Sequence, residues 1–261
     1  MRELIVRTVK RGVGRYGYEL VRVGSVPATV SEEEEFPPDF DEATRATVRA
    51  VEGYTMTGPE KLYSLCHAVR HVIAHDVPGA IVECGVWRGG SMMAAARTLL
   101  ELDAANRDLY LFDTYEGMPE PTEHDVDFAG VSVLERWNAQ RHNRFVPREA
   151  RASLPEVRTA MGTVGYDESR IHFVKGMVED TIPTQAPEQI ALLRLDTDYY
   201  ESTRHEMFEL YPRLSRNGVL IIDDFGHFRG SEKAVREFLA ATGEPILLHR
   251  IDYSGRVGVK P

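Results

Sequence analysis

Short apolar runs alternate with amphipathic stretches from residue 79 to the end of the chain, and this alternation limits the possible folds more than any other feature. The apolar runs, which we expect to be strands, are residues 80–84, 109–113, 171–174, 191–196, 219–223, 246–251 and 257–260. The stretches expected to be helices include residues 90–102, 203–211 and 231–241. Strands that alternate with helices need crossover connections, which build parallel sheets. The sequence therefore predicts an α/β fold, with a seven-stranded, mostly parallel sheet covered by helices on both faces.

The segments before and within this pattern have a different character. Residues 1–23 form a basic amphipathic pattern, which predicts a helical arm lying on a membrane surface, on its own domain or on a second subunit. An acidic run followed by paired prolines at residues 31–39 predicts a linker. Residues 118–167 show no clear strand pattern, and we expect a lid or substrate-binding insertion there. The predicted division is an arm and linker over residues 1–53 and one domain over 54–261.

Composition excludes several classes of protein. The 261 residues carry a formal net charge of −10, which disfavours nucleic-acid binding. No run of about 18 apolar residues is present, so stable membrane insertion is not expected. The two cysteines, Cys66 and Cys84, are too few for a disulfide framework and fit a reducing environment, which predicts a cytoplasmic protein.

A glycine turn follows the first expected strand. Gly85, Gly89 and Gly90 would let backbone amides approach a polar ligand where the chain enters a helix. Their spacing differs from the G-x-G-x-x-G pattern that cradles a pyrophosphate, which argues against a nicotinamide-dependent oxidoreductase. Glu83, just before the turn, could accept a hydrogen bond from an ammonium group, and dinucleotides carry none.

The second expected strand ends at Asp113. A carboxylate at this position, beside the glycine turn, can hold two ribose hydroxyls. Acidic residues at strand ends also cap helices, and glycine turns also serve tight packing. The two segments together nevertheless indicate a nucleoside with an amino-acid tail, and the cofactor that fits this description is S-adenosylmethionine.

Four aspartates follow two later strands of the expected sheet. Asp196 and Asp198 close one strand, and Asp223 and Asp224 close the next, so all four should meet at one edge. Crowded carboxylates repel one another unless a cation holds them, and hard oxygen ligands favour Mg²⁺ over zinc. We expect Asp196, Asp223 and Asp224 to bind Mg²⁺ and Asp198 to act as general base on an acceptor hydroxyl. The alternative is that these residues only cap helices and bind backbone amides.

Six segments resemble the macrocin O-methyltransferase family, which includes the sugar O-methyltransferases of mycinamicin and novobiocin biosynthesis. The resemblance runs from about residue 54 to the C-terminus. Its motifs are YTMTG (54–58), ECGVWRGG (83–90), DTYEG (113–117), LRLDTDY (193–199), YPRLS (211–215) and IIDDF (221–225). The resemblance implies a Rossmann-like class I methyltransferase that is a homodimer or a higher homo-oligomer.

The resemblance also implies the residues of the site. It supports Asp196, Asp223 and Asp224 as Mg²⁺ ligands and Asp198 as the base. The residues implied around S-adenosylmethionine are Thr55, Met56, Glu83, Gly85, Val86, Trp87, Arg88, Gly89, Gly90, Ser91, Asp113, Thr114, Tyr115, Glu116, Gly117 and Asp180. Met177 and Thr197 depart from the family, which often has an aromatic residue and a glycine at these positions.

The sequence analysis thus predicts a Mg²⁺- and S-adenosylmethionine-dependent O-methyltransferase. The expected acceptor is a sugar hydroxyl of a glycosylated natural product, a glycolipid or an oligosaccharide, contacted by the arm and the insertion. Two alternatives stay open: a catechol-type O-methyltransferase, which also needs a metal to hold adjacent oxygens, and a non-catalytic module that binds S-adenosylmethionine.

Overall fold

The computed structural model describes residues 36–141 and 151–261. The chain divides into two units, Met1–Phe40 and Asp41–Pro261, and every described helix and strand belongs to the second unit. The predicted basic arm and the start of the acidic run lie outside the described residues.

The seven predicted strands form one sheet, in the order β3-β2-β1-β4-β5-β7-β6. They are β1 (Ala80–Cys84), β2 (Leu109–Asp113), β3 (Ile171–Lys175), β4 (Ile190–Leu195), β5 (Leu214–Ile222), β6 (His249–Arg250) and β7 (Arg256–Val259). Pairing is parallel from β3 to β5, and β7 lies antiparallel to both β5 and β6. The strand order reverses between β1 and β4, the position at which open α/β sheets bind ligands beyond the carboxyl ends of their strands.

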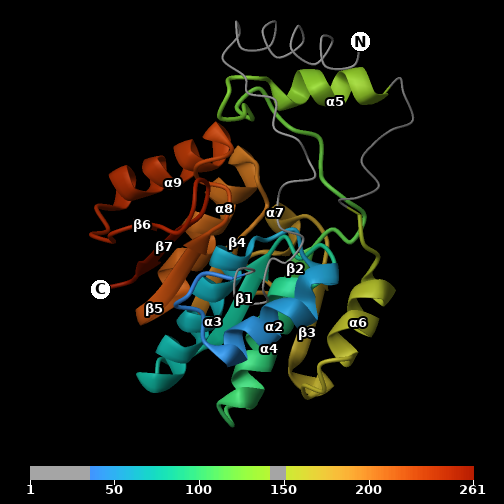
Figure 1. Cartoon of the computed structure of the whole chain (residues 1–261). Helices are drawn as coiled ribbons and strands as arrows, with labels where there is room; N and C mark the ends of the chain where they lie inside the picture. The colour runs from blue at the N-terminus through green and yellow to red at the C-terminus, as the bar shows by residue number, and fades with distance from the viewer. Residues whose placement is uncertain (1–35, 142–150) are drawn as a thin grey trace, which may run out of the picture. The chain divides into compact units, whose positions relative to one another are not determined.

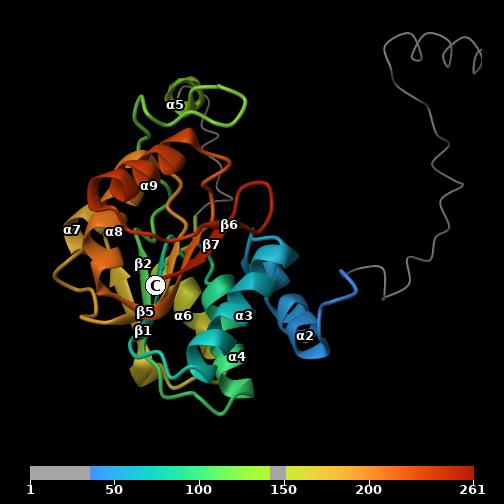
Figure 2. The ribbon, with the colours of Figure 1, turned by 90° about the vertical axis from the view of Figure 1, so that its left-hand side faces the viewer.

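Helices cover both faces of this sheet (Figures 1 and 2). The α-helices are α2 (Glu42–Val51), α3 (Pro59–Ala74), α4 (Gly90–Glu101), α5 (Val133–Arg141), α6 (Leu154–Gly162), α7 (Val178–Thr181), α8 (Tyr200–Leu210) and α9 (Arg229–Thr242). Short 3-10 helices are η2 (Glu52–Tyr54), η4 (Glu168–Arg170) and η5 (Tyr211–Arg213). Helices α3, α4 and α6 lie on one face, and α8 and α9 lie on the other.

Helix α2 packs on α3 and α4, so the compact unit begins at Asp41. The sequence analysis assigned this helix to the arm. Asp41 caps it, since its side chain accepts a hydrogen bond from the Thr44 amide at 3.0 Å.

The central strands are buried along their whole length, as expected for a parallel sheet covered on both faces. Apolar side chains such as Val82, Leu193 and Leu220 fill the core. Arg194 is the exception, because this charged residue is only 2% exposed in the middle of an apolar run. It lies opposite Glu83 in the register of β1 and β4, which brings two buried charges side by side.

The insertion at residues 118–167 contains α5 and α6. Its first part is anchored to the domain by Asp125, which is fully buried. One Asp125 oxygen accepts the Tyr200 amide at 2.8 Å, at the start of α8, and the other accepts the Thr122 amide at 2.6 Å. A backbone bridge also pairs Asp127 with Phe228. The insertion therefore begins as part of the rim of the sheet, and its role as a lid stays a prediction.

Over the described ranges, no helix combines the length and the apolar character that a membrane crossing needs. Cys66 and Cys84 are both buried free thiols.

Candidate active site

A cleft of about 500 Å³ opens beyond the carboxyl ends of β1, β2, β4 and β5. Nine of the residues predicted to contact S-adenosylmethionine line it: Thr55, Met56, Gly85, Val86, Trp87, Ser91, Asp113, Thr114 and Gly117. Both acidic strand ends reach the same cleft, through Asp196, Asp198, Asp223 and Asp224. The segments predicted to bind S-adenosylmethionine and Mg²⁺ thus line one continuous space.

The glycines of the turn permit close backbone approach. A Cβ atom on Gly85, whose φ is +83°, would lie 2.0 Å from the carbonyl oxygen of Asp196. A Cβ atom on Gly90 would lie 2.6 Å from the carbonyl oxygen of Tyr54. The turn after β1 therefore packs directly on the acidic loop after β4 and on the segment before α3. Gly89 and Gly90 themselves, with Arg88, do not line the cleft, so their role here is in packing and helix entry.

Asp113 organises the turn as well as facing the cleft. Its Oδ2 atom accepts hydrogen bonds from the Val86 and Trp87 amides at 2.7 and 3.0 Å, and its Oδ1 atom accepts the Tyr115 amide at 2.7 Å. A carboxylate has about four lone-pair positions. Asp113 spends most of them on the backbone, which leaves Oδ1 as the atom for a ribose hydroxyl.

Glu83 lies beneath the cleft, does not line it and is 1% exposed. Its Oε1 atom accepts a hydrogen bond from Nη1 of Arg194 at 2.5 Å, while Oε2 has no protein partner. Burial raises the pKa of Glu83 to about 7, against which Arg194 acts. The partner of Glu83 in this structure is therefore a guanidinium, where the sequence analysis expected a ligand ammonium.

The remaining predicted cofactor residues lie away from the cleft lining. Tyr115 is buried and donates its hydroxyl to the Leu111 carbonyl, and Glu116 pairs with Lys175 at 2.7 Å. Asp180 is exposed on α7, whereas its neighbour Glu179 lines the cleft and has a buried, unpartnered Oε2 atom. The α7 segment thus faces the cleft through a different acid from the one predicted.

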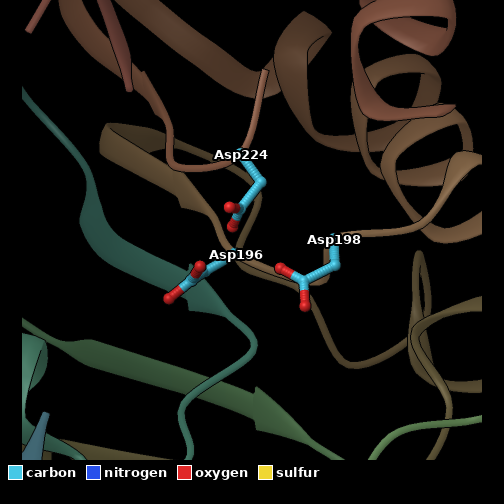
Figure 3. A group of neighbouring side chains, drawn as sticks. All are labelled: Asp196, Asp198 and Asp224. Atoms are coloured by element: carbon cyan, nitrogen blue, oxygen red, sulfur yellow. The ribbon is translucent and has the colours of Figure 1, made fainter. Parts of the chain in front are cut away.

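Asp196, Asp198 and Asp224 form a compact group of carboxylates (Figure 3). One oxygen from each lies within 4.8 Å of the other two. The first two enter from the loop after β4 and the third from the loop after β5, as parallel neighbouring strands require. Asp198 adopts a left-handed conformation with φ of 67°, a strained geometry that turns its side chain back to the group.

Asp223 is buried beside this group but has different partners. Its Oδ1 atom accepts Nη2 of Arg194 at 2.5 Å, and its Oδ2 atom accepts Nζ of Lys61, also at 2.5 Å. Arg194 additionally binds Asp196 at 2.7 Å and the Thr57 hydroxyl at 2.9 Å. Asp223 is thus not among the clustered carboxylates, and each of its oxygens keeps only one further lone pair for a cation.

Burial and mutual repulsion set the charges of these acids. Burial raises the pKa of Asp196 and of Asp198 well above the ordinary range, and Asp224 adds to the shift of each. Burial would raise the pKa of Asp223 too, but Arg194 and Lys61 lower it. Arg194, which pairs with Asp196 at 2.7 Å, offsets only part of the pKa shift of that carboxyl group.

A divalent cation fits this donor set. With Glu83, which Arg194 also binds, five acids and the two cations Arg194 and Lys61 leave a formal charge of −3, and one divalent ion offsets two of these charges. The clustered donors are all carboxylate oxygens, the ligands that Mg²⁺ prefers. The fit rests on oxygens that converge from two loops and on pKa shifts that a positive ion would reverse.

Two positions that depart from the family pattern also lie at the cleft. Met177 lines it beside α7. Thr197 donates its hydroxyl to Glu206 at 3.0 Å, and Glu206 is completely buried on α8. This hydrogen bond ties the loop between Asp196 and Asp198 to the helix that follows.

Comparisons with known proteins identify the family of this chain. A model of the macrocin-O-methyltransferase (TylF) family matches residues 21–257. Mycinamicin III 3''-O-methyltransferase of Micromonospora griseorubida is 32% identical over 202 residues, covering 77% of this chain and 76% of that protein. The tetracenomycin-C 4'-O-methyltransferase of Streptomyces olivaceus, whose name specifies a dimethoxy-α-L-rhamnosyl substrate, is 33% identical over 202 residues, or 77% of this chain and 74% of that protein. Among solved structures, the O-methyltransferase NovP shares 30% identity with a TM-score of 0.69, covering 79% of this chain and 82% of that one.

Proposed function

The chain belongs to the macrocin-O-methyltransferase (TylF) family, and we propose that it transfers a methyl group from S-adenosylmethionine to a sugar hydroxyl of a glycosylated small molecule. The observation that carries the proposal is the single cleft lined by both the Asp113 segment and the clustered aspartates. Methyl transfer is an in-line displacement, so the donor sulfonium and the acceptor oxygen must meet in one space. The relatives support the sugar acceptor, since the name of one of them specifies a rhamnosyl group.

The cofactor side of the cleft is the part between the glycine turn and β2. Gly85, Val86 and Trp87 line this part, and Asp113 holds the Val86 and Trp87 amides and would offer Oδ1 to a ribose hydroxyl. Thr55 and Met56, in the segment before α3, also line the cleft. We assign the adenine end to Met177 and Glu179, which line the same space.

The acceptor side is the group of aspartates. Asp196 and Asp224 would hold Mg²⁺, and a bound divalent cation would lower the pKa of an acceptor hydroxyl that reaches it. Asp198 has a carboxylate oxygen within 4.8 Å of both, so we assign it the removal of the proton from that hydroxyl. Asp223 steadies Arg194 and Lys61, and its place among the metal ligands stays a prediction. A homo-oligomeric state and a cytoplasmic location also stay predictions.

The test is methyl transfer itself. The full chain is incubated with methyl-labelled S-adenosylmethionine, Mg²⁺ and either a set of glycosides or catechol, and products are followed by mass spectrometry. We expect glycosides to gain one labelled methyl group and EDTA to abolish the gain. Transfer to catechol and to no glycoside would overturn the sugar acceptor, and full activity in EDTA would overturn the metal.

Asp198→Asn examines the base. Turnover should fall by roughly 10²–10⁴-fold with cofactor affinity unchanged, because the amide cannot accept the proton. Asp167→Asn, which changes an exposed aspartate far from the cleft lining, is the matched control. Wild-type turnover in Asp198→Asn would remove this residue from the mechanism.

A further inference from the structure

Three aromatic side chains lie together near the aspartates, and two of them, His227 and Tyr253, line the cleft. Phe128 comes from the insertion, His227 from the loop after β5 and Tyr253 from the loop before β7. The ring of Phe128 lies 5.4 Å from that of His227 and 6.4 Å from that of Tyr253, measured between centroids. We call these three residues the aromatic platform.

The platform is open to ligands. Phe128 is 61% exposed and Tyr253 is 57% exposed, although both are large side chains with apolar rings. Among described residues, few large apolar side chains show comparable exposure, and two of those few stand together here. Adjacent exposed aromatic rings at a cleft are typical of a ligand-binding surface.

Hydrogen bonds hold the platform in place before any ligand binds. The hydroxyl of Tyr253 lies 3.1 Å from Nδ1 of His227. The two loops touch closely, since a Cβ atom on Gly226 would lie 2.2 Å from the carbonyl oxygen of Tyr253. Arg229 donates to the carbonyl oxygen of Phe128 at 3.3 Å, which fixes the insertion at the start of α9. A preformed surface of this kind binds with little loss of side-chain entropy.

The platform is continuous with the acidic group. The backbone amide of His227 donates to the carbonyl oxygen of Asp224 at 3.0 Å, so the aromatic loop and the clustered carboxylate belong to one turn. His227 and Tyr253 line the same cleft as Asp198 and Asp224. A molecule with a hydroxyl at the aspartates would therefore have its adjoining atoms over the aromatic rings.

We propose that the platform of Phe128, His227 and Tyr253 is the acceptor subsite, and that it stacks on the apolar C–H face of a pyranose ring whose hydroxyl reaches the aspartates. This inference rests on the proposed function. It specifies that the aromatic platform recognises the pyranose ring of the acceptor. A pyranose presents polarised C–H bonds to the negative face of an aromatic ring, while its hydroxyls point outward to polar groups. The arrangement of rings beside carboxylates matches this division of one sugar into an apolar face and a polar edge.

Two glycosides distinguish sugar stacking from stacking of an aromatic aglycone. Methyl α-L-rhamnopyranoside has no aromatic ring, and p-nitrophenyl α-L-rhamnopyranoside has one. Binding of each to the full chain loaded with S-adenosylhomocysteine is followed by saturation-transfer NMR, and methylation of each with labelled S-adenosylmethionine gives kcat and KM. The variants are Phe128→Ala and Tyr253→Ala, with Leu247→Ala as control, because Leu247 is 79% exposed and does not line the cleft.

We expect each platform variant to raise KM for the methyl glycoside about 10-fold or more, which corresponds to about 1.4 kcal/mol of lost binding. Affinity for S-adenosylhomocysteine should stay at the wild-type value in both, and Leu247→Ala should change nothing. Unchanged KM in both variants would overturn the platform, as would a wild type that neither binds nor methylates either glycoside. An effect on the aryl glycoside alone would overturn the sugar assignment. Binding that depends on the platform without any methylation would support the subsite and contradict the proposed function.

Discussion

Arg194 and Asp223 form an ion pair of 2.5 Å between β4 and the end of β5, with the guanidinium 2% exposed. The same guanidinium binds Glu83 and Asp196, so one cation joins acidic residues from three neighbouring strands. A buried charge of this kind costs desolvation free energy and is retained only when its partners are fixed around it. Arg194 therefore sets the positions of the acids on which the cation site depends.

Removal of Arg194 should be strongly destabilising. Arg194→Met removes the guanidinium from Glu83 and Asp196 and leaves Asp223 with Lys61 alone, and we expect the free energy of unfolding to fall by about 3–5 kcal/mol. Arg236→Met is the matched control, because Arg236 is 67% exposed and pairs with Glu232 on the surface of α9, where a pair contributes at most about 1 kcal/mol. Denaturant unfolding of both variants provides the comparison. Equal losses would mean that the buried network contributes no more than a surface pair.

Gly90 should not tolerate a side chain. A Cβ atom there would lie 2.6 Å from the Tyr54 carbonyl oxygen and from Cβ of Thr55, so Gly90→Ala should push that segment from the cleft. We expect a stability loss of about 1–3 kcal/mol together with weaker S-adenosylmethionine binding. Gly53→Ala is the control, since nothing lies within 4 Å of its added Cβ. Calorimetric titration and thermal unfolding measure the two effects, and a Gly90→Ala protein that matches Gly53→Ala would refute the packing argument.

Asp113→Asn should weaken cofactor binding while the fold persists. The Asp113 carboxylate accepts hydrogen bonds from the backbone N–H groups of Val86, Trp87 and Tyr115 through both of its oxygens. An asparagine side chain keeps only one of these two acceptor oxygens. We expect S-adenosylmethionine affinity to fall about 10-fold or more, equal to about 1.4 kcal/mol. Asp108→Asn, immediately before the same strand but outside the cleft, should bind as the wild type does. Equal affinities in titration calorimetry would show that Asp113 does not organise the site.

Stability of the metal-free protein should fall as pH rises. The pKa of Glu83 is raised to about 7 from 4.5, so the folded state keeps a proton that the unfolded chain releases. The stabilisation from this bound proton is complete below the pKa of Glu83 in the unfolded chain and is lost as pH approaches its pKa in the folded protein. The raised pKa values of Asp196 and Asp198 change stability in the same direction. We expect Tm in EDTA to decrease from about pH 5 to about pH 7.

Two comparisons make the pH prediction specific. Mg²⁺ should restore Tm most at the upper end of this range, because cations bind deprotonated carboxylates. Glu83→Gln should flatten the pH profile, whereas Glu188→Gln, at an exposed position, should not. A rising or flat wild-type profile in EDTA would contradict the assignment of buried, protonated acids.

The sheet could be predicted because its signals are local. The expected limits of β1 and β2 agree with the structure, since an apolar run is ended in each case by glycine or a polar residue. Strand β5 starts at Leu214, earlier than the expected residue 219. The prediction began too late because Arg216 and Asn217 are polar and exposed, so the apolar pattern becomes continuous only after them. Pairing with β4 across an irregularity, at Ile190 and Leu214, is what extends the strand.

The partners of the acids could not be predicted in the same way. Arg194 meets Glu83 only through the register of β1 on β4, and Lys61 meets Asp223 across 162 residues of sequence. The only sequence feature that could have pointed to the role of Arg194 was its charge within the apolar run of β4. The sequence of α3 held no feature that predicted a contact between Lys61 and an acid. The sequence also could not show that Glu179, and not Asp180, lines the cleft, because neighbouring acids on a short helix point in different directions.

The central claim is that methyl donor and cation share one cleft, and paramagnetic relaxation tests it most directly. Mn²⁺ is added to the full chain with S-adenosylmethionine carrying a ¹³C-labelled methyl group, and the methyl resonance is recorded with and without EDTA. We expect strong broadening of the bound methyl signal that EDTA reverses and that Asp224→Asn weakens. A methyl signal that stays sharp while both Mn²⁺ and the cofactor are bound would place the two sites apart and contradict the account.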